Sequence, residues 1–263
     1  MPLRKLEPAF HGRVWGARDL NPWFPDAPAQ ASGLPIGEVW FETPEVPLLV
    51  KFLFTEEDLS VQAHPDDAYA ALHHNSPGKT EMWRVLAARK GAKVAAGFRE
   101  PVTREQVRAA ALDGSIVDLL EWFDARAGDT FFIPAGTVHA IGAGLTICEI
   151  QQRSDVTYRL HDYGRGRELH LDHGLAVSRL GRHAARGAGN VVCPHFMTEP
   201  LDVAGRISLA PPSHNELVIA IEGEGEIGGQ RIRGGDVFLI RSNLDMIEIT
   251  GTLRLLRTSS PCA

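Results

Sequence analysis

The sequence predicts a mostly β protein made of two related sandwich or small-barrel units, with a small helical insertion in the first unit. Short apolar runs bounded by glycine and proline recur along the chain, as is typical of antiparallel β structure. The segments "GDTFFIPAGTVH" (128–139) and "GDVFLIRSNLDM" (235–246) each begin a strand after a Gly-rich turn, which indicates a degenerate internal repeat. The second copy lacks the proline, glycine and histidine of the first, so we expect the chemistry in the first unit.

The individual elements follow from changes in the apolar period. Proline, glycine and tryptophan are frequent in the first 45 residues, which predicts short strands and turns there. Later strands are expected at 47–54, 59–65, 80–88, 93–98, 129–134, 145–152 and 156–163. Helices are expected at 66–74, twice within an insertion near 101–124 that Gly114 interrupts, and at 171–180. The Gly/Ala/Arg-rich segment 181–190 predicts a boundary between domains at 1–180 and 191–263.

The overall composition excludes several classes of protein. Of the 263 residues 44% are hydrophobic and 23% charged, which is ordinary for a globular protein. The net charge of -6 argues against nucleic-acid binding. The three cysteines are widely spaced, and neither an apolar leader nor an apolar run of membrane length is apparent. We therefore expect a soluble cytoplasmic protein that binds neither nucleic acid nor membranes.

The stretch "LSVQAHP" (59–65) alternates apolar and polar residues like a half-buried strand. Side chains of a strand point alternately to its two faces, so Ser60, Gln62 and His64 share one face. Such a face either is exposed to water, as an isolated Gln-x-His pair usually is, or lines a cavity that binds a ligand.

Two further residues complete a set of metal ligands with Gln62 and His64. Glu81 begins the next predicted strand, and His139 ends "IPAGTVH", where a glycine permits a tight turn before a strand. Two imidazoles, a carboxylate and an amide oxygen suit a borderline divalent cation such as Zn²⁺. We therefore expect a metal site formed by Gln62, His64, Glu81 and His139.

Charged residues also interrupt otherwise apolar strands. Glu149 and Arg159 lie in the middle of the strands predicted at 145–152 and 156–163, where a buried charge is unfavourable unless it is paired or used. One interpretation is a Glu149–Arg159 salt bridge that joins two strands, and the other places both residues in the metal cavity. Lys51 similarly interrupts "PLLVKFLF" (47–54).

Four segments together resemble a known family. The stretches "LSVQAHPDDAYA", "GKTEMW", "GDTFFIPAGTVHAIGAG" and "EIQQRSDVTYRLHDYGR" are similar, in this order, to the motifs of type I mannose-6-phosphate isomerases in their short bacterial form. The likeness extends from about residue 14 to about residue 177. It implies two cupin (jelly-roll) units, the second degenerate, and a zinc enzyme that interconverts mannose 6-phosphate and fructose 6-phosphate.

The resemblance also implies roles for individual residues. The zinc ligands of the family fall on the set already selected from strand geometry. The catalytic arginine falls on Arg159, and an acidic position that faces the metal falls on Glu149. Residues that contact the sugar and its phosphate fall on Lys51, Ser60, Lys79 and Arg165.

Some alternatives remain open from the sequence. Aldose–ketose exchange proceeds through a cis-enediol(ate), and its base is Glu149, a metal-bound hydroxide or a group near His139. Two histidines and a carboxylate also suit an iron(II) oxygenase, and a third interpretation is a sugar-binding cupin without catalysis. Within the isomerase interpretation the partner is a small sugar phosphate, and the protein is a monomer or a homodimer.

Overall fold

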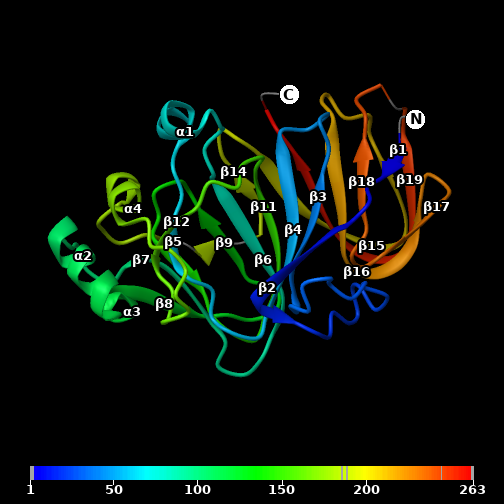
Figure 1. Cartoon of the computed structure of the whole chain (residues 1–263). Helices are drawn as coiled ribbons and strands as arrows, with labels where there is room; N and C mark the ends of the chain where they lie inside the picture. The colour runs from blue at the N-terminus through cyan, green and yellow to red at the C-terminus, as the bar shows by residue number, and fades with distance from the viewer. Residues whose placement is uncertain (1–2, 185, 188, 244, 262–263) are drawn as a thin grey trace. The chain divides into compact units, whose positions relative to one another are not determined.

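The computed structural model describes residues 3–184, 186–187, 189–243 and 245–261 (Figure 1). Within these residues the chain forms nineteen β-strands and four short helices. It divides into two compact units, which we call the central unit (residues 53–187) and the terminal unit (residues 1–52 and 188–263). This arrangement confirms the predicted mostly β fold with a helical insertion.

The central unit contains two sets of antiparallel strands. A five-stranded sheet has the order β12-β5-β10-β7-β8, and a second sheet includes β13-β9-β6-β11 in that order. The strands are β5 (Val61–Ala63), β6 (Glu81–Ala88), β7 (Lys93–Phe98), β8 (Leu120–Asp124), β9 (Thr130–Ile133), β10 (His139–Ile141), β11 (Leu145–Gln152), β12 (Tyr158–His161) and β13 (Arg186–Gly187). The helices are α1 (Asp67–His74), α2 (Arg104–Asp113), α3 (Ile116–Leu119) and α4 (Leu171–Val177).

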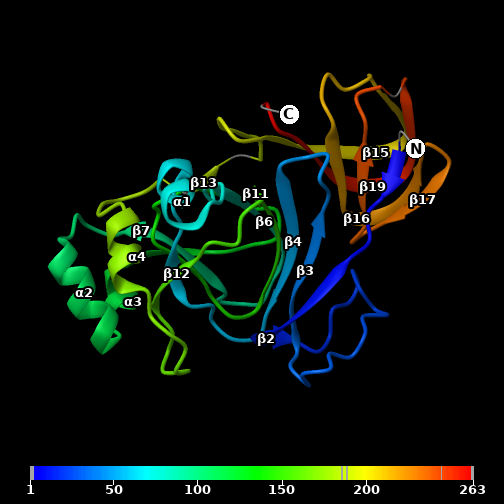
Figure 2. The same cartoon turned by 45° about the horizontal axis from the view of Figure 1, so that its top comes forward.

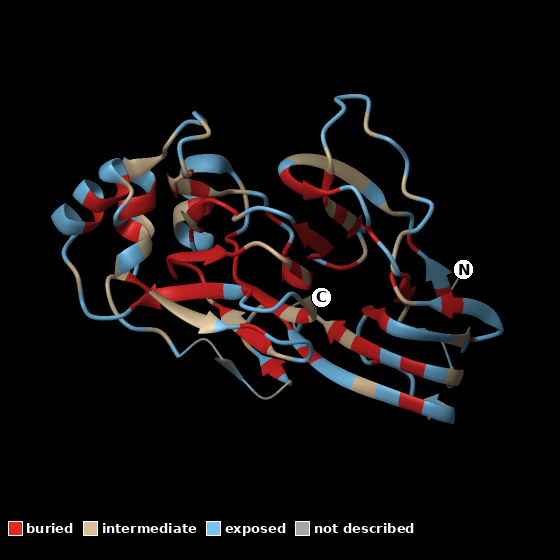
Figure 3. Cartoon of the chain, turned by 90° about the horizontal axis from the view of Figure 1, so that it is seen from below, coloured by how far each residue is buried: buried red, intermediate tan, exposed pale blue. Residues whose placement is uncertain are grey.

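Helices cover one face of the five-stranded sheet. Figures 1 and 2 both show α2, α3 and α4 beside this sheet. Val61, Ala63, Ala140 and Leu160 of the sheet belong to one buried cluster with apolar residues of α2, α3 and α4. Figure 3 shows buried and exposed positions alternating around α2, as an amphipathic helix requires. The neighbouring strand positions therefore point to the opposite face, which the helices leave uncovered.

The insertion follows the sequence prediction closely at its start and less closely at its end. Thr103 caps α2 in a capping box with Gln106, and Gly114 ends it in the left-handed region at φ 89°. The second helix is shorter than predicted and ends at Leu119, because Leu120 begins β8.

The strands predicted at 93–98 and 145–152 are confirmed, whereas those predicted at 59–65 and 156–163 are reduced to β5 and β12.

The terminal unit contains a sheet of order β1-β18-β16-β19-β15-β14, with β17 paired to β16, and a separate pairing of β2 with β3. Its strands are β1 (Leu3–Lys5), β2 (Ala9–Ala17), β3 (Ile36–Glu42), β14 (Val191–Val192), β15 (Met197–Leu209), β16 (Glu216–Ile227), β17 (Gln230–Arg233), β18 (Val237–Ile240) and β19 (Ile247–Ser259). The fully buried strand β4 (Leu48–Thr55) contributes residues to both units. The predicted domains, 1–180 and 191–263, place residues 1–52 in the first domain, whereas these residues belong here to the same unit as residues 188–263. The predicted domain boundaries stay a prediction.

The internal repeat is visible in the backbone hydrogen bonds around each Gly-Asp pair. In the central unit, the Gly128 amide donates to the Val85 carbonyl, and the Val85 amide donates to the Asp129 carbonyl. Both bonds are 2.9 Å long. In the terminal unit, Gly235 and Asp236 make the same two bonds with Ala220, both at 2.8 Å. The aspartate side chain also accepts from the backbone three residues earlier in both copies. The two segments are therefore copies of one supersecondary unit.

No helix in the described part of the chain is both long and apolar enough to cross a membrane.

Candidate metal centre

Three of the predicted ligands meet in the central unit. One ligand atom each from His64, Glu81 and His139 lies within 4.8 Å of the other two. His64 directly follows β5, Glu81 begins β6 and His139 begins β10, so three separate strands supply them. Each of the three residues is at most 1% exposed. These residues form what we call the metal cluster.

Short backbone contacts hold the three segments together. The Lys79 amide donates to the Pro65 carbonyl at 2.9 Å, and the Gly136 amide donates to the His64 carbonyl at 2.8 Å. Gly136 has φ 85°, and a Cβ there would lie 2.7 Å from the Val177 carbonyl oxygen. Because only glycine fits this conformation in so little space, the glycine of "IPAGTVH" fixes the turn that presents His139.

Strand register places Gln62 and Arg159 on the same face as His139. Gln62 is directly opposite His139 on β10 and directly opposite Arg159 on β12. Residues that are directly opposite in adjacent strands project to the same face, and here the helices cover the other face. Gln62, the predicted fourth ligand, therefore projects to the same face of the sheet as His139 of the metal cluster.

The tautomers of both histidines follow from their hydrogen bonds. Nδ1 of His139 is 2.8 Å from the Thr137 carbonyl oxygen, and Nδ1 of His64 is 3.1 Å from the Val156 carbonyl oxygen. A carbonyl only accepts, so each Nδ1 carries the hydrogen and each Nε2 has its lone pair available. This second contact, from the far ring nitrogen to a carbonyl, is the usual arrangement for histidines that bind metals.

The two Nε2 atoms face the carboxylate of Glu81. The distance is 3.5 Å from His139 Nε2 to Glu81 Oε1, and 3.6 Å from His64 Nε2 to Glu81 Oε2. His139 Nε2 is buried and makes no hydrogen bond within the described residues. Burial lowers the pKa of His139 to about 4, so the ring is neutral at pH 7. Lone pairs and a carboxylate that converge in a buried space fit a cation between them, and nitrogen and oxygen donors of this kind fit Zn²⁺.

Lys79 is the buried cation closest to this cluster. Its Nζ is 2.9 Å from His64 Nε2 and forms an ion pair with Glu81. Burial disfavours its charged form, but the carboxylates of Glu81 and Glu149 outweigh burial and raise the pKa of Lys79. The predicted substrate-binding lysine therefore lies at the metal cluster itself.

Glu149 lies next to the metal cluster through a shared indole. Trp83 Nε1 donates to Glu149 Oε2 at 3.0 Å and to Glu81 Oε1 at 3.1 Å. Glu149 is directly opposite Trp83 in the pairing of β11 with β6, and it is 4% exposed. Trp83 was not among the predicted site residues, although its position two residues after Glu81 on a strand places both side chains on one face.

Arg159 and Glu149 do not join two neighbouring strands. Arg159 lies on β12 in the five-stranded sheet, whereas Glu149 lies on β11 in the second sheet, so the predicted alternative of a salt bridge between adjacent strands is wrong. Arg159 Nη1 donates to the Glu168 carbonyl at 2.8 Å, while its buried Nε makes no hydrogen bond within the described residues. Burial and the neighbouring Arg167 guanidinium lower the pKa of Arg159.

The remaining predicted contact residues have different surroundings. Ser60 is buried immediately before β5. Arg165 donates from Nη2 to the Asp58 carbonyl at 2.8 Å and forms an ion pair of 3.2 Å with Asp162. Lys51, on the part of β4 that belongs to the terminal unit, is 3% exposed, and its Nζ lies 4.5 Å from the centre of the Trp40 ring.

A comparison with curated proteins finds close relatives over the whole length of the chain. A mannose-6-phosphate isomerase of Streptococcus mutans is 30% identical over 308 aligned positions, which cover 97% of this chain and 97% of the relative. The chain belongs to the mannose-6-phosphate isomerase family. No protein-family model matches the sequence.

Solved structures of this family share the fold. The crystal structure of the mannose 6-phosphate isomerase from Bacillus subtilis matches with a TM-score of 0.86 and 24% identity, over 98% of this chain and 99% of that chain. A zinc-bound holo structure of a mannose 6-phosphate isomerase matches with a TM-score of 0.75 and 15% identity, over 99% of this chain and all of the other. At these identities the likeness establishes the fold of the isomerase family.

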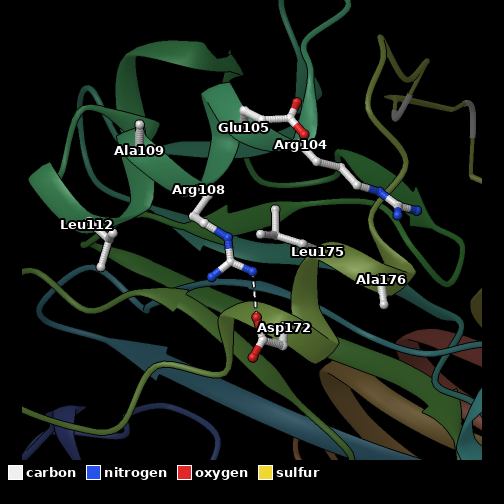
Figure 4. A pocket seen from close by; sticks show the side chains of 8 residues that line it. All are labelled: Arg104, Glu105, Arg108, Ala109, Leu112, Asp172, Leu175 and Ala176. Carbon is white, nitrogen blue, oxygen red and sulfur yellow. Dashed lines mark hydrogen bonds and ion pairs between the residues drawn. The ribbon is translucent and has the colours of Figure 1, made fainter.

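A separate groove lies between α2 and α4 of the central unit. It has a volume of about 530 Å³ and is lined by residues such as Arg104, Arg108 and Leu175 (Figure 4). Arg108 pairs across it with Asp172. None of its lining residues belongs to the metal cluster, so the groove and the metal cluster are separate features of the central unit.

Proposed function

We propose that the chain is a zinc-dependent aldose–ketose isomerase that interconverts mannose 6-phosphate and fructose 6-phosphate. The observation that carries the proposal is the metal cluster, in which two buried imidazoles and a buried carboxylate direct their donor atoms to one space. Membership of the isomerase family supports the choice of substrate, and a zinc-bound relative supports the choice of metal.

The proposed metal ligands are His64, Glu81 and His139, with Gln62 as the fourth. When bound, the zinc ion supplies Lewis-acid polarisation of the sugar oxygens. The reaction moves one proton between carbon 1 and carbon 2 of the sugar through a cis-enediol(ate), so the protein must supply an acid/base group and stabilise negative charge.

We assign the acid/base role to Glu149. Its carboxylate shares the Trp83 Nε1–H with Glu81, which places it at the edge of the metal cluster. His139 is a poor base for the transfer because its Nδ1–H is held by the Thr137 carbonyl and its Nε2 is reserved for the metal. Glu149 would take the proton from one of the two carbons and return it to the other.

Charge stabilisation and substrate anchoring fall to the cationic residues. Arg159 projects to the same face as Gln62, and its planar, permanently charged guanidinium suits an enediolate oxygen. For the sugar and phosphate contacts we propose Lys51, Ser60, Lys79 and Arg165.

The direct test is conversion of mannose 6-phosphate to fructose 6-phosphate by the purified protein, before and after treatment with a chelator. We expect conversion that falls with the loss of zinc and returns when Zn²⁺ is added back. Equal conversion at full and at negligible metal content would contradict the zinc requirement, and failure to convert the sugar phosphate in the zinc-loaded protein would contradict the activity.

The same assay separates the alternative functions. An iron(II) oxygenase requires O₂ and iron, whereas we expect isomerisation to be equal in air and under anaerobic conditions. A sugar-binding protein without catalysis would bind mannose 6-phosphate without converting it. A cytoplasmic location and a monomeric or homodimeric state stay predictions.

A further inference from the structure

The repeat extends from the Gly-Asp turn to the positions of the metal cluster. In the central unit Glu81 is opposite Ile133 on β9 and opposite Gln151 on β11. In the terminal unit Glu216 is opposite Ile240 on β18 and opposite Ser259 on β19. Since Ile133 and Ile240 both follow the Gly-Asp pair by the same number of residues, Glu216 is the counterpart of the proposed ligand Glu81.

The same register gives Glu149 a counterpart of opposite charge. Glu149 is opposite Trp83, two residues after Glu81. In the terminal unit Arg257 is opposite Val218, two residues after Glu216. Glu81 and Glu149 thus lie on adjacent strands, offset by two residues, and we call this a diagonal pair. The diagonal pair of the central unit consists of two carboxylates, whereas that of the terminal unit, Glu216 and Arg257, consists of a carboxylate and a guanidinium.

The two diagonal pairs are neutralised in different ways. The carboxylates of Glu81 and Glu149 share the Trp83 Nε1–H and have the Lys79 ammonium beside them, with space that fits a metal ion. Glu216 is 3% exposed, and both of its oxygens lie 2.9 Å from Arg257 Nε. The terminal unit thus pairs the one carboxylate of its diagonal pair with one guanidinium, whereas the diagonal pair of the central unit has one ammonium beside its two carboxylates.

A small polar pocket remains at this position in the terminal unit. It has a volume of about 100 Å³ and is lined by Glu199, His214, Glu216 and Arg257, among others. His214 precedes Glu216 by two residues, as Lys79 precedes Glu81, while the counterpart of His139 is the exposed Met246. Within the described residues, the terminal unit has no group of three close ligands like the metal cluster.

We propose that this pocket is a former metal site in which the Arg257 guanidinium now takes the place of the ion, so that removing Arg257 leaves the buried Glu216 carboxylate to be paired by a divalent cation from solution. A buried carboxylate needs either a paired cation or a proton. Burial already raises the pKa of Glu216 even with Arg257 present. Arg257 therefore blocks metal binding in the terminal unit and stabilises the unit by charge.

The test compares the zinc content of Arg257→Ala with that of the unaltered protein, by equilibrium dialysis against Zn²⁺ and metal analysis. We expect Arg257→Ala to bind one additional equivalent, and Arg257→Ala/Glu216→Gln to lose it again. Because the result is a difference between two proteins, it does not depend on whether the metal cluster holds zinc. Arg254→Ala, which removes an exposed arginine on the same strand, is the matched control and should leave the zinc content unchanged. Equal zinc content in Arg257→Ala and the unaltered protein would overturn the former-site proposal.

Thermal unfolding in the presence of a chelator provides the second readout, including for a variant that folds poorly. Arg257→Met leaves Glu216 buried without a partner, so we expect the Tm to fall by roughly 10 °C. Adding Glu216→Gln removes the uncompensated charge and should recover at least half of that loss. If the single and double variants unfold at the same temperature, Arg257 acts through packing rather than charge and the proposal fails.

Discussion

At the scale of single residues, two backbone carbonyls decide the chemistry of the metal cluster. By accepting the Nδ1–H of His139 and of His64, the carbonyls of Thr137 and Val156 leave both Nε2 lone pairs directed at Glu81. These two contacts fix the orientation of both rings, as is usual for histidines that bind a metal.

Replacing His139 by alanine removes one lone pair from this set. We expect His139→Ala to weaken zinc binding by about tenfold or more, with the protein still folded. Metal analysis after dialysis checks this, and the exposed His73→Ala is the control. A variant that retained the zinc content of the unaltered protein would remove His139 from the ligand set.

Replacing Arg159 should change the rate of the reaction and not the binding of zinc. We expect Arg159→Ala to lower kcat by about a hundredfold or more while the zinc content stays unchanged, because the guanidinium stabilises charge in the reaction rather than the metal. The exposed Arg126→Ala should retain full activity. Normal turnover in Arg159→Ala would exclude the residue from the mechanism.

Sequence spacing was sufficient to select three residues that converge, but not the groups that support them. Gln-x-His on a strand, Glu81 at a strand start and the terminal histidine of "IPAGTVH" were recognisable, and His64, Glu81 and His139 do converge. The role of Trp83 was not recognised, because an indole in an apolar strand looks the same as an ordinary core residue. The carbonyl partners of the histidines leave no signal in a sequence at all.

At the scale of elements, the turn before β10 sets the position of His139. Gly91 and Gly136 have nearly the same φ, 83° and 85°, but a Cβ at Gly91 would meet nothing within 4 Å. We expect Gly136→Ala to lower the free energy of unfolding by on the order of 1–3 kcal/mol and to weaken zinc binding, since strain and a clash act together.

Gly91→Ala isolates the backbone strain from the clash. Urea unfolding of both variants should give a smaller loss for Gly91→Ala and no change in its zinc binding. Equal losses in the two variants would show that the contact of Gly136 with Val177 contributes nothing.

Most strands of the central unit were predictable, but β8 and the pairing partners of the strands were not. Residues 145–152 and 156–163 are consecutive strand signals, and one interpretation of the sequence joined them through a Glu149–Arg159 salt bridge. In the structure β11 and β12 belong to different sheets. The pairing depends on which distant strands are available, and a period of two in the sequence carries no information on that choice.

At the scale of the whole molecule, buried and half-buried ion pairs make stability depend on pH. The Thr43 hydroxyl and the Arg241 guanidinium lower the pKa of Glu45 to about 2. A carboxylate whose pKa is lowered in the folded state stabilises the protein above the unfolded-state value of 4.5, and this contribution is lost as the pH falls toward 2.

We therefore expect Glu45→Gln to lower the free energy of unfolding by on the order of 1 kcal/mol at pH 6. The difference from the unaltered protein should shrink between pH 4.5 and pH 2, which urea titrations across this range would measure. The exposed Glu42→Gln serves as the control. A difference that is constant with pH would mean that Glu45 does not act through its charge.

The path of the chain through β4 limits how this protein can be dissected. Leu48–Thr55 is a continuous, fully buried strand, yet its first five residues belong to the terminal unit and its last three to the central unit. A fragment cut at 53–187 would begin inside a strand, and its complement would consist of two separate pieces. Autonomous halves would therefore have to be made by circular permutation, with the C-terminal segment fused ahead of residue 1, rather than by simple truncation.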